Sequence, residues 1–152
     1  AAEYLLAKGH TNIAYLGSDG NLMFSADRRT GYQLALMNSG IAVNPENIVE
    51  LPFIPEENLS SVQTLLQKEN RPTAILVSDD LFAVALERVC IEMGIRIPED
   101  LSIISFNNWD FKENIPLSHK WDVILFTKSP GDQWSPLRDD FDKLEFSCLI
   151  SI

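Results

Sequence analysis

The sequence predicts an α/β fold, a doubly wound parallel sheet, followed by a C-terminal tail of irregular character. Short apolar runs alternate with helical segments from residue 1 to residue 108. Such alternation is typical of parallel sheets whose two faces are covered by helices. After residue 108 the alternation stops, and all three tryptophans and three of the eight prolines lie in this last part. We therefore treat 109–152 as a tail of uncertain structure.

Each predicted element has a local signal. The expected helices are 1–8, 26–38, one that opens at Pro55 and stops before Pro72, and 81–93. The expected strands are 12–17, 48–53, 74–77 and 101–106. Ser25 or Asp27 is the expected N-cap of the second helix, and Gly94 is expected to close the last one.

Composition narrows the classes of function. The hydrophobic content of 45% and charged content of 22% are ordinary for a globular domain, and 152 residues favour a single one. The net charge of −10 argues against a surface that follows nucleic-acid phosphates. The sequence has no apolar run near the roughly 20 residues that span a bilayer, no secretory signal and no metal-ligand spacing. We expect a cytoplasmic protein with no membrane contact, metal or other cofactor.

Polar side chains follow two neighbouring strands and predict a binding edge. Asp79 and Asp80 come directly after strand 74–77, and Asn107 follows strand 101–106. Ligands of open α/β sheets bind outside the carboxyl ends of the strands. Arg28 is expected in the first turn of its helix, at the same edge, where the helix dipole disfavours a cation. Arginine, carboxylate and amide groups together suit the hydroxyls of a neutral polyol.

Simpler explanations exist for each of these residues. A carboxylate at a helix start can serve only as a cap, an asparagine after a strand can form a turn, and an arginine can be solvated. No histidine or further acid stands at useful spacing, so we do not expect an enzyme.

The helix expected at 81–93 is apolar nearly all round. A helix that covers a sheet needs only one apolar stripe, so its outer face calls for a second partner. We expect Val89 and Met93 on that outer face.

Several motifs stand in the order found in one protein family. They are Ala2-x-x-Leu5 to Gly9-His10-x-x-Ile13, Arg28-x-x-Gly31-Tyr32, Pro72-Thr73-Ala74-Ile75, Ser78-Asp79-Asp80-Leu81-Phe82-Ala83 and Ile97-Pro98-Glu99-Asp100-Leu101-Ser102-Ile103-Ile104-Ser105-Phe106-Asn107-Asn108. Together they resemble the C-terminal lobe of the effector-binding domain in the lactose/galactose repressor family of bacterial transcription regulators. The resemblance covers 1–108, and 109–152 does not match the family.

The resemblance implies a periplasmic-binding-protein-like lobe and a sugar effector. It places Arg28 at the family's sugar-contacting arginine, Asp79 with its neighbour Asp80 at a polar contact, and Asn107 where an acid or amide grips sugar hydroxyls. The Phe106-Asn107-Asn108 sequence resembles regulators of maltose-type operons, which suggests maltose or a maltodextrin. The resemblance also implies a homodimer through 81–93 and DNA binding only through a domain outside this chain.

Two alternatives stay open at this point. A periplasmic-type sugar-binding protein of a transport system would share the lobe, because fold alone does not separate the two functions. The chain is expected to be a fragment, because the family's N-terminal helix-turn-helix, hinge and first lobe have no counterpart in it. A shifted reading frame after about Asn108 is a hypothesis for the change of character there.

Overall fold

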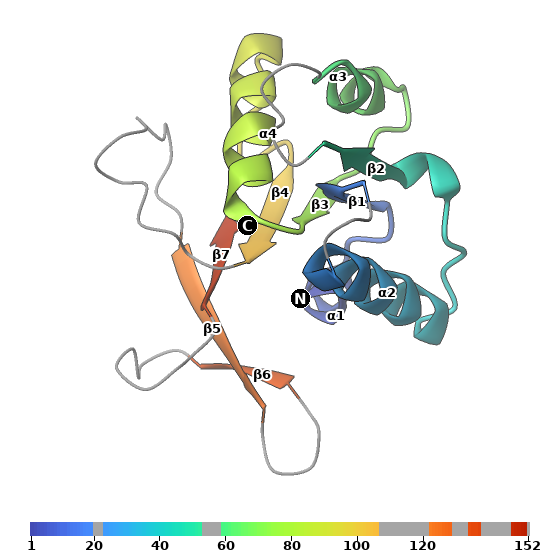
Figure 1. The fold of residues 1–152 in the computed structure, drawn as a ribbon, viewed down its shortest axis with the longest axis vertical. Coiled ribbons are helices and arrows are strands. Elements are labelled where there is room, and N and C mark those ends of the chain that lie inside the picture. Colours follow the sequence, from blue (N-terminus) through green and yellow to red (C-terminus); the bar gives the residue numbers. More distant parts are fainter. Residues whose placement is uncertain (20–22, 53–58, 107–121, 129–133, 138–146, 152) are drawn as a thin grey trace.

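The structure, a computed structural model, describes residues 1–19, 23–52 and 59–106, together with the backbone of three later strands (Figure 1). The helices are α1 (Ala2–Ala7), α2 (Met23–Asn38), α3 (Ser60–Gln67) and α4 (Asp80–Met93), with a 3₁₀ helix η1 (Pro45–Asn47). The strands are β1 (Ile13–Ser18), β2 (Ile48–Leu51), β3 (Ala74–Val77), β4 (Ser102–Phe106), β5 (Asp122–Lys128), β6 (Trp134–Leu137) and β7 (Ser147–Ser151). Within the described part, no helix is both long and apolar enough to cross a membrane.

The first four strands form a parallel sheet in the order β2-β1-β3-β4. Leu16 near the end of β1 lies opposite Val77 at the end of β3. The backbone N–H of Ser78 donates to the carbonyl of Leu16 at 2.8 Å, which keeps the two strands paired to their last residues. The carboxyl ends of these strands therefore share one edge of the sheet, as the α/β prediction requires.

Helices cover both faces of this sheet, so each strand contributes side chains to two cores. In Figure 1 the helices α3 and α4 lie over one face, and α1 and α2 lie over the other. Successive strand residues alternate between the faces: Ile75 belongs to the core under α3 and α4, and Leu76 to the core under α1 and α2. This doubly wound arrangement confirms the predicted fold class.

The last three strands extend the sheet through antiparallel pairings. β7 pairs antiparallel with β4, β5 with β7, and β6 with β5. β5 includes the apolar run Val123–Phe126, whereas β6 and β7 had no clear sequence signal. The strand–helix alternation does not resume in the parts of 109–152 that the structure describes. The domain boundary at residue 108 stays a prediction.

The start of α2 corrects one prediction. The helix begins at Met23, so neither Ser25 nor Asp27 is its N-cap. Ser25 is buried in the first turn and its hydroxyl bonds across to β1 instead of to its own helix. The helix expected to open at Pro55 is described only from Ser60 onward, and Pro55 itself lies outside the described residues.

A second prediction, which placed Val89 and Met93 on the outer face of α4, also differs from the structure. Val89 is 0% exposed because Phe82, Leu86, Val89 and Cys90 form the stripe, at i, i+4, i+7 and i+8, that packs on the sheet. Met93 is half-buried against the same core. Ile91, which is 56% exposed, is the large apolar residue that α4 presents to solvent. The prediction that Val89 faces outward is wrong.

Candidate functional site at the carboxyl edge of the sheet

Arg28 is the residue that ties helix α2 to the carboxyl edge of the sheet. Its Nη1 donates to the backbone carbonyl of Ser78, just past the end of β3. Its guanidinium lies over the ring of Phe106, 4.4 Å from the ring centre, and 5.2 Å from the ring centre of Phe24. A guanidinium over an aromatic face is held in orientation as well as in place. Arg28 is thus fixed at the edge and is not a solvated side chain.

The prediction that Arg28 lies in the first turn of its helix is wrong. Because α2 begins at Met23, Arg28 falls in the second turn and lies beyond the strongest part of the helix dipole. Its position is better explained by its three contacts than by a cation misplaced at a helix start. Phe24, four residues earlier on the same helix face, contributes one of these contacts.

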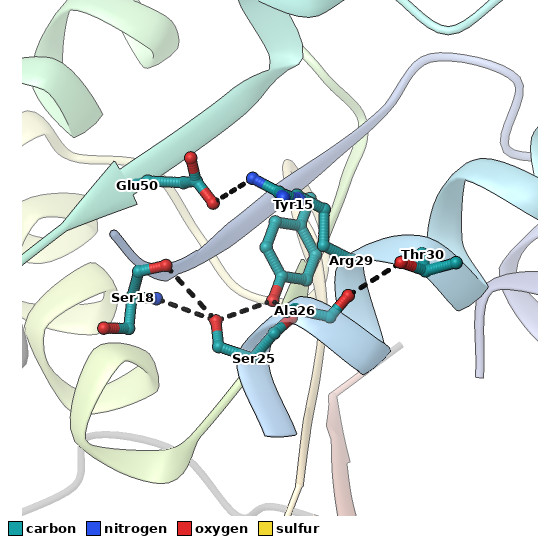
Figure 2. Close-up of polar contacts among 7 residues, drawn as sticks. All are labelled: Tyr15, Ser18, Ser25, Ala26, Arg29, Thr30 and Glu50. Atoms are coloured by element: carbon teal, nitrogen blue, oxygen red, sulfur yellow. Dashed lines mark hydrogen bonds and ion pairs between the residues drawn. The ribbon is translucent and has the colours of Figure 1, made fainter. Parts of the chain in front are cut away.

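Arg29 is adjacent in sequence and points elsewhere. Its Nη1 lies 2.5 Å from Oε1 of Glu50 on β2, and about a third of each side chain is exposed. Figure 2 shows this pair beside the buried contacts of Tyr15 and Ser25. Exposed ion pairs of this kind add little stability. Of the two neighbouring arginines, only Arg28 contacts the ends of β3 and β4.

Asp79 and Asp80 are both buried and both have structural partners. Asp79 is the N-cap of α4: its Oδ1 accepts from the backbone N–H of Leu81 at 3.0 Å, as a capping aspartate does. Asp80 accepts from the hydroxyl of Ser105 on β4 at 2.6 Å. The Asp80–Ser105 bond joins the start of α4 to the sheet at the predicted binding edge. Their predicted contact with a ligand stays a prediction.

Asn107, the fourth predicted site residue, lies outside the described residues. Its neighbour Phe106 ends β4 and touches Arg28. Arg28 therefore reaches the residue that directly precedes Asn107. The sequence analysis did not identify Phe24 and Phe106 as partners of Arg28. Two signals were available: Phe24 stands four positions before Arg28, and Phe106 directly precedes Asn107.

A cavity of about 270 Å³ adjoins Arg28 on the α1–α2 side of the sheet. Its lining combines apolar side chains, among them Leu76 and Phe106, with the polar side chains of Glu3, Arg28 and Asn38.

The described residues include one free cysteine, Cys90. Cys90 is fully buried, and burial raises the pKa of its thiol to about 12, which keeps it protonated. Cys90 therefore acts as a small core residue. Among residues 1–19, 23–52 and 59–106, no cluster of three or more histidine, cysteine, aspartate or glutamate side chains could hold a metal ion.

The fold and this edge define a ligand-binding α/β lobe, and comparison with known proteins gives its family. Residues 2–116 match the periplasmic binding protein-like domain, and the chain belongs to this family. The match extends a few residues past the boundary suggested by the motifs.

The similar curated proteins are transcription regulators. The chain is 32% identical over 108 residues to the HTH-type transcriptional repressor PurR of Erwinia tasmaniensis and 36% identical over 108 residues to the HTH-type transcriptional regulator DegA of Bacillus subtilis. Each match covers 71% of this chain and 32% of the relative. The chain thus spans about a third of the length of the curated relatives it matches.

A solved structure with the same fold is a putative transcriptional regulator LacI from Bacillus cereus subsp. cytotoxis. It is 35% identical, with a TM-score of 0.68, over 74% of this chain and 40% of that one. The similarity to regulators supports the predicted relation to repressors. Nothing in these matches singles out regulators of maltose operons.

Proposed function

We propose that this chain is the effector-binding and dimerisation lobe of a sugar-responsive bacterial transcription regulator that acts in the cytoplasm. The observation that carries the proposal is the fixed guanidinium of Arg28, held over Phe106 at the carboxyl edge of a sheet whose relatives are repressors. The transport alternative shares the fold, but the curated relatives described above are regulators.

The proposed ligand is a sugar, with maltose or a maltodextrin as the specific candidate. Arg28 presents charged donors, which make stronger hydrogen bonds than neutral ones. Asn107 offers a donor and an acceptor side by side, a pattern that pairs with vicinal hydroxyls. Asp79 caps α4, and Asp80 bonds the start of that helix to β4. We propose that both also contribute carboxylate oxygens to the same site.

The test is calorimetric titration of the complete regulator, of which this chain is the proposed lobe, with maltose and, for comparison, with ribose. Arg28→Ala should weaken binding by roughly 1.5–3 kcal/mol and Asn107→Ala by roughly 1–3 kcal/mol, since each leaves a desolvated hydroxyl without its partner. Arg29→Ala is the matched control, because its ion pair with Glu50 lies away from Arg28's contacts. Equal sugar affinity in the parent, Arg28→Ala and Arg29→Ala proteins would refute the assignment of Arg28.

We propose that DNA is contacted by another domain of the regulator, because this lobe is acidic. The net charge of −10 disfavours contact with nucleic-acid phosphates. In a gel-shift assay at physiological salt, the 152-residue chain should show no sequence-selective binding. Selective binding by this chain would contradict the proposed division of labour.

The proposed dimer forms through α4. Ile91 is 56% exposed on this helix, and a large apolar side chain at that position gains from cover by a second copy. Ile91→Glu should shift the regulator from dimer to monomer in analytical ultracentrifugation. Leu34→Glu on α2 is the control, because Leu34 is similarly exposed, at 51%, on the other face of the sheet. A dimer unchanged by Ile91→Glu would remove α4 from the interface.

A further inference from the structure

Two buried hydroxyls fasten the first turn of α2 to the end of β1. The Tyr15 hydroxyl donates to the backbone carbonyl of Ser25 at 2.7 Å and lies 3.0 Å from the Ser25 hydroxyl. The Ser25 hydroxyl oxygen also accepts from the backbone N–H of Ser18 at 3.0 Å. Figure 2 shows these bonds running from strand to helix. All three residues are at most 1% exposed.

The missing side chain of Gly17 makes this contact possible. Tyr15 and Gly17 point to the same face of β1, and the tyrosine lies along the strand over the glycine. A Cβ at Gly17 would be 2.6 Å from the Tyr15 hydroxyl and 2.8 Å from the Ser25 hydroxyl. Both distances are far below normal contact, so any larger residue would displace the hydroxyl pair.

Arg28 follows directly after this first turn of α2. The first turn of a helix lacks intrahelical partners for its N–H groups, so outside contacts fix its position. Ser25 precedes Arg28 by three residues, close to one helical turn, and both reach toward the sheet. A small rotation of α2 about its axis would move the guanidinium off Phe106.

We propose that Tyr15 and Ser25 are positioning residues for Arg28. Their hydroxyls fix the rotation and depth of α2 so that the guanidinium stays over Phe106 and against the Ser78 carbonyl. The inference rests on the proposed function for its biological meaning, since Arg28 is the proposed sugar ligand. Its physical content is a statement about the orientation of Arg28 and can be tested without any sugar.

The chain provides a matched control in a second buried tyrosine. The hydroxyl of Tyr32 on α2 donates to the carbonyl of Ile13 at 2.9 Å, and Tyr32 is 1% exposed. The rings of Tyr15 and Tyr32 lie 5.7 Å apart between centres in the same core. Both tyrosines therefore join α2 to β1 through one hydroxyl. The Tyr32 hydroxyl bonds at the amino end of the strand, whereas the Ser78 carbonyl that accepts from Arg28 lies at the carboxyl edge.

The experiment is nuclear magnetic resonance of the 152-residue chain with ¹⁵N-labelled arginine. The Nε–H signal of Arg28, assigned by its loss in Arg28→Lys, should be displaced upfield by the ring of Phe106. Tyr15→Phe should remove most of this displacement, and Tyr32→Phe should leave it unchanged. Backbone amide spectra establish that both variants are folded.

Ser25→Ala is the second variant and keeps the inference testable if Tyr15→Phe does not fold. It removes the Ser25 hydroxyl and should reduce the displacement less than Tyr15→Phe does, since the bond from Tyr15 to the Ser25 carbonyl remains. An unchanged Arg28 signal in Tyr15→Phe, or in Ser25→Ala where it alone is folded, would overturn the proposal. An equal change in Tyr15→Phe and Tyr32→Phe would also overturn it, because it would show general loosening of the core.

A titration with maltose separates this inference from the proposed function. If Tyr15 acts on sugar binding only through Arg28, Tyr15→Phe should weaken maltose binding severalfold in the parent regulator and not at all in the Arg28→Ala background. A further loss in that background would overturn the positioning role. If Arg28→Ala itself leaves maltose binding unchanged, the proposed function fails for Arg28, and the resonance experiment still decides whether Tyr15 positions it.

Discussion

The two faces of the sheet are held to their helices by different means. Under α3 and α4, apolar side chains such as Leu86 and Ile103 are 0% exposed, and the buried Asp80–Ser105 hydrogen bond joins the start of α4 to β4. Under α1 and α2 the core includes two tyrosines, each bonded through its hydroxyl to a backbone carbonyl across the strand–helix contact. Apolar packing is non-directional, whereas a hydrogen bond fixes both distance and angle. The helix that holds Arg28 is therefore bonded to β1 near both ends of the strand, whereas the Asp80–Ser105 bond orients α4 at its start.

The largest expected effect on stability lies in the core under α3 and α4. Leu86→Ala should lower the free energy of unfolding by about 2–5 kcal/mol, because it removes buried apolar volume and leaves a cavity. Urea denaturation followed by circular dichroism measures the change. Leu34→Ala is the control, since Leu34 is 51% exposed, and should change stability by less than about 0.5 kcal/mol. Equal losses in both would mean that α4 does not pack as described.

On the other face a single added methyl group should be costly. Gly17→Ala should destabilise the chain by about 1–3 kcal/mol through overpacking against Tyr15 and Ser25. Gly31→Ala provides the contrast: a Cβ there meets nothing within 4 Å, and alanine in a helix interior is favoured over glycine by about 0.5–1 kcal/mol. Opposite signs in the same denaturation experiment are expected. A neutral Gly17→Ala would show that the hydroxyl pair is not close-packed.

At the carboxyl edge of the sheet, the start of α4 is stabilised by its N-cap, Asp79. Asp79→Ala should cost about 0.5–2 kcal/mol, because the backbone N–H of Leu81 loses its acceptor. Asp79→Asn should retain most of the stability, since asparagine caps helices about as well as aspartate. If both substitutions cost the same, the loss comes from the charge of Asp79 and not from capping.

The β3–α4–β4 unit could be predicted in detail because its signals are local. The strand ends, the cap at Asp79 and the left-handed Gly94, with φ of 69°, all lie within a few residues of the features they determine. The start of α2 could not be predicted in this way. Ser25 is a good capping residue in isolation, but tertiary bonds to β1 use its hydroxyl and the helix begins earlier.

In the candidate site, too, the features with local sequence signals could be predicted and those set by tertiary contacts could not. Sequence placed Arg28 at the carboxyl edge, and the structure brings it to the ends of β3 and β4. The partners that orient it, Phe106 and the Tyr15–Ser25 pair, come from distant positions and depend on how α2 rotates on the sheet. The outward face of α4 failed for a different reason: an almost wholly apolar helix gives a weak indication of which stripe faces the core, and Val89 was assigned to the wrong side.

The smallest expected effect is a pH dependence on the α1–α2 side. His10 follows α1, and its Nδ1 lies 2.9 Å from the Thr73 hydroxyl; burial lowers its pKa below the usual 6.5. The unfolded chain therefore takes up a proton first as pH falls, so stability should fall from about pH 6.5 downward and level off below the lowered pKa. We expect the urea midpoint to drop more between about pH 7.5 and 5.5 in the parent than in His10→Gln, which cannot titrate. Identical drops would show that the pKa of His10 is the same in the folded and unfolded chain and would contradict its lowering by burial.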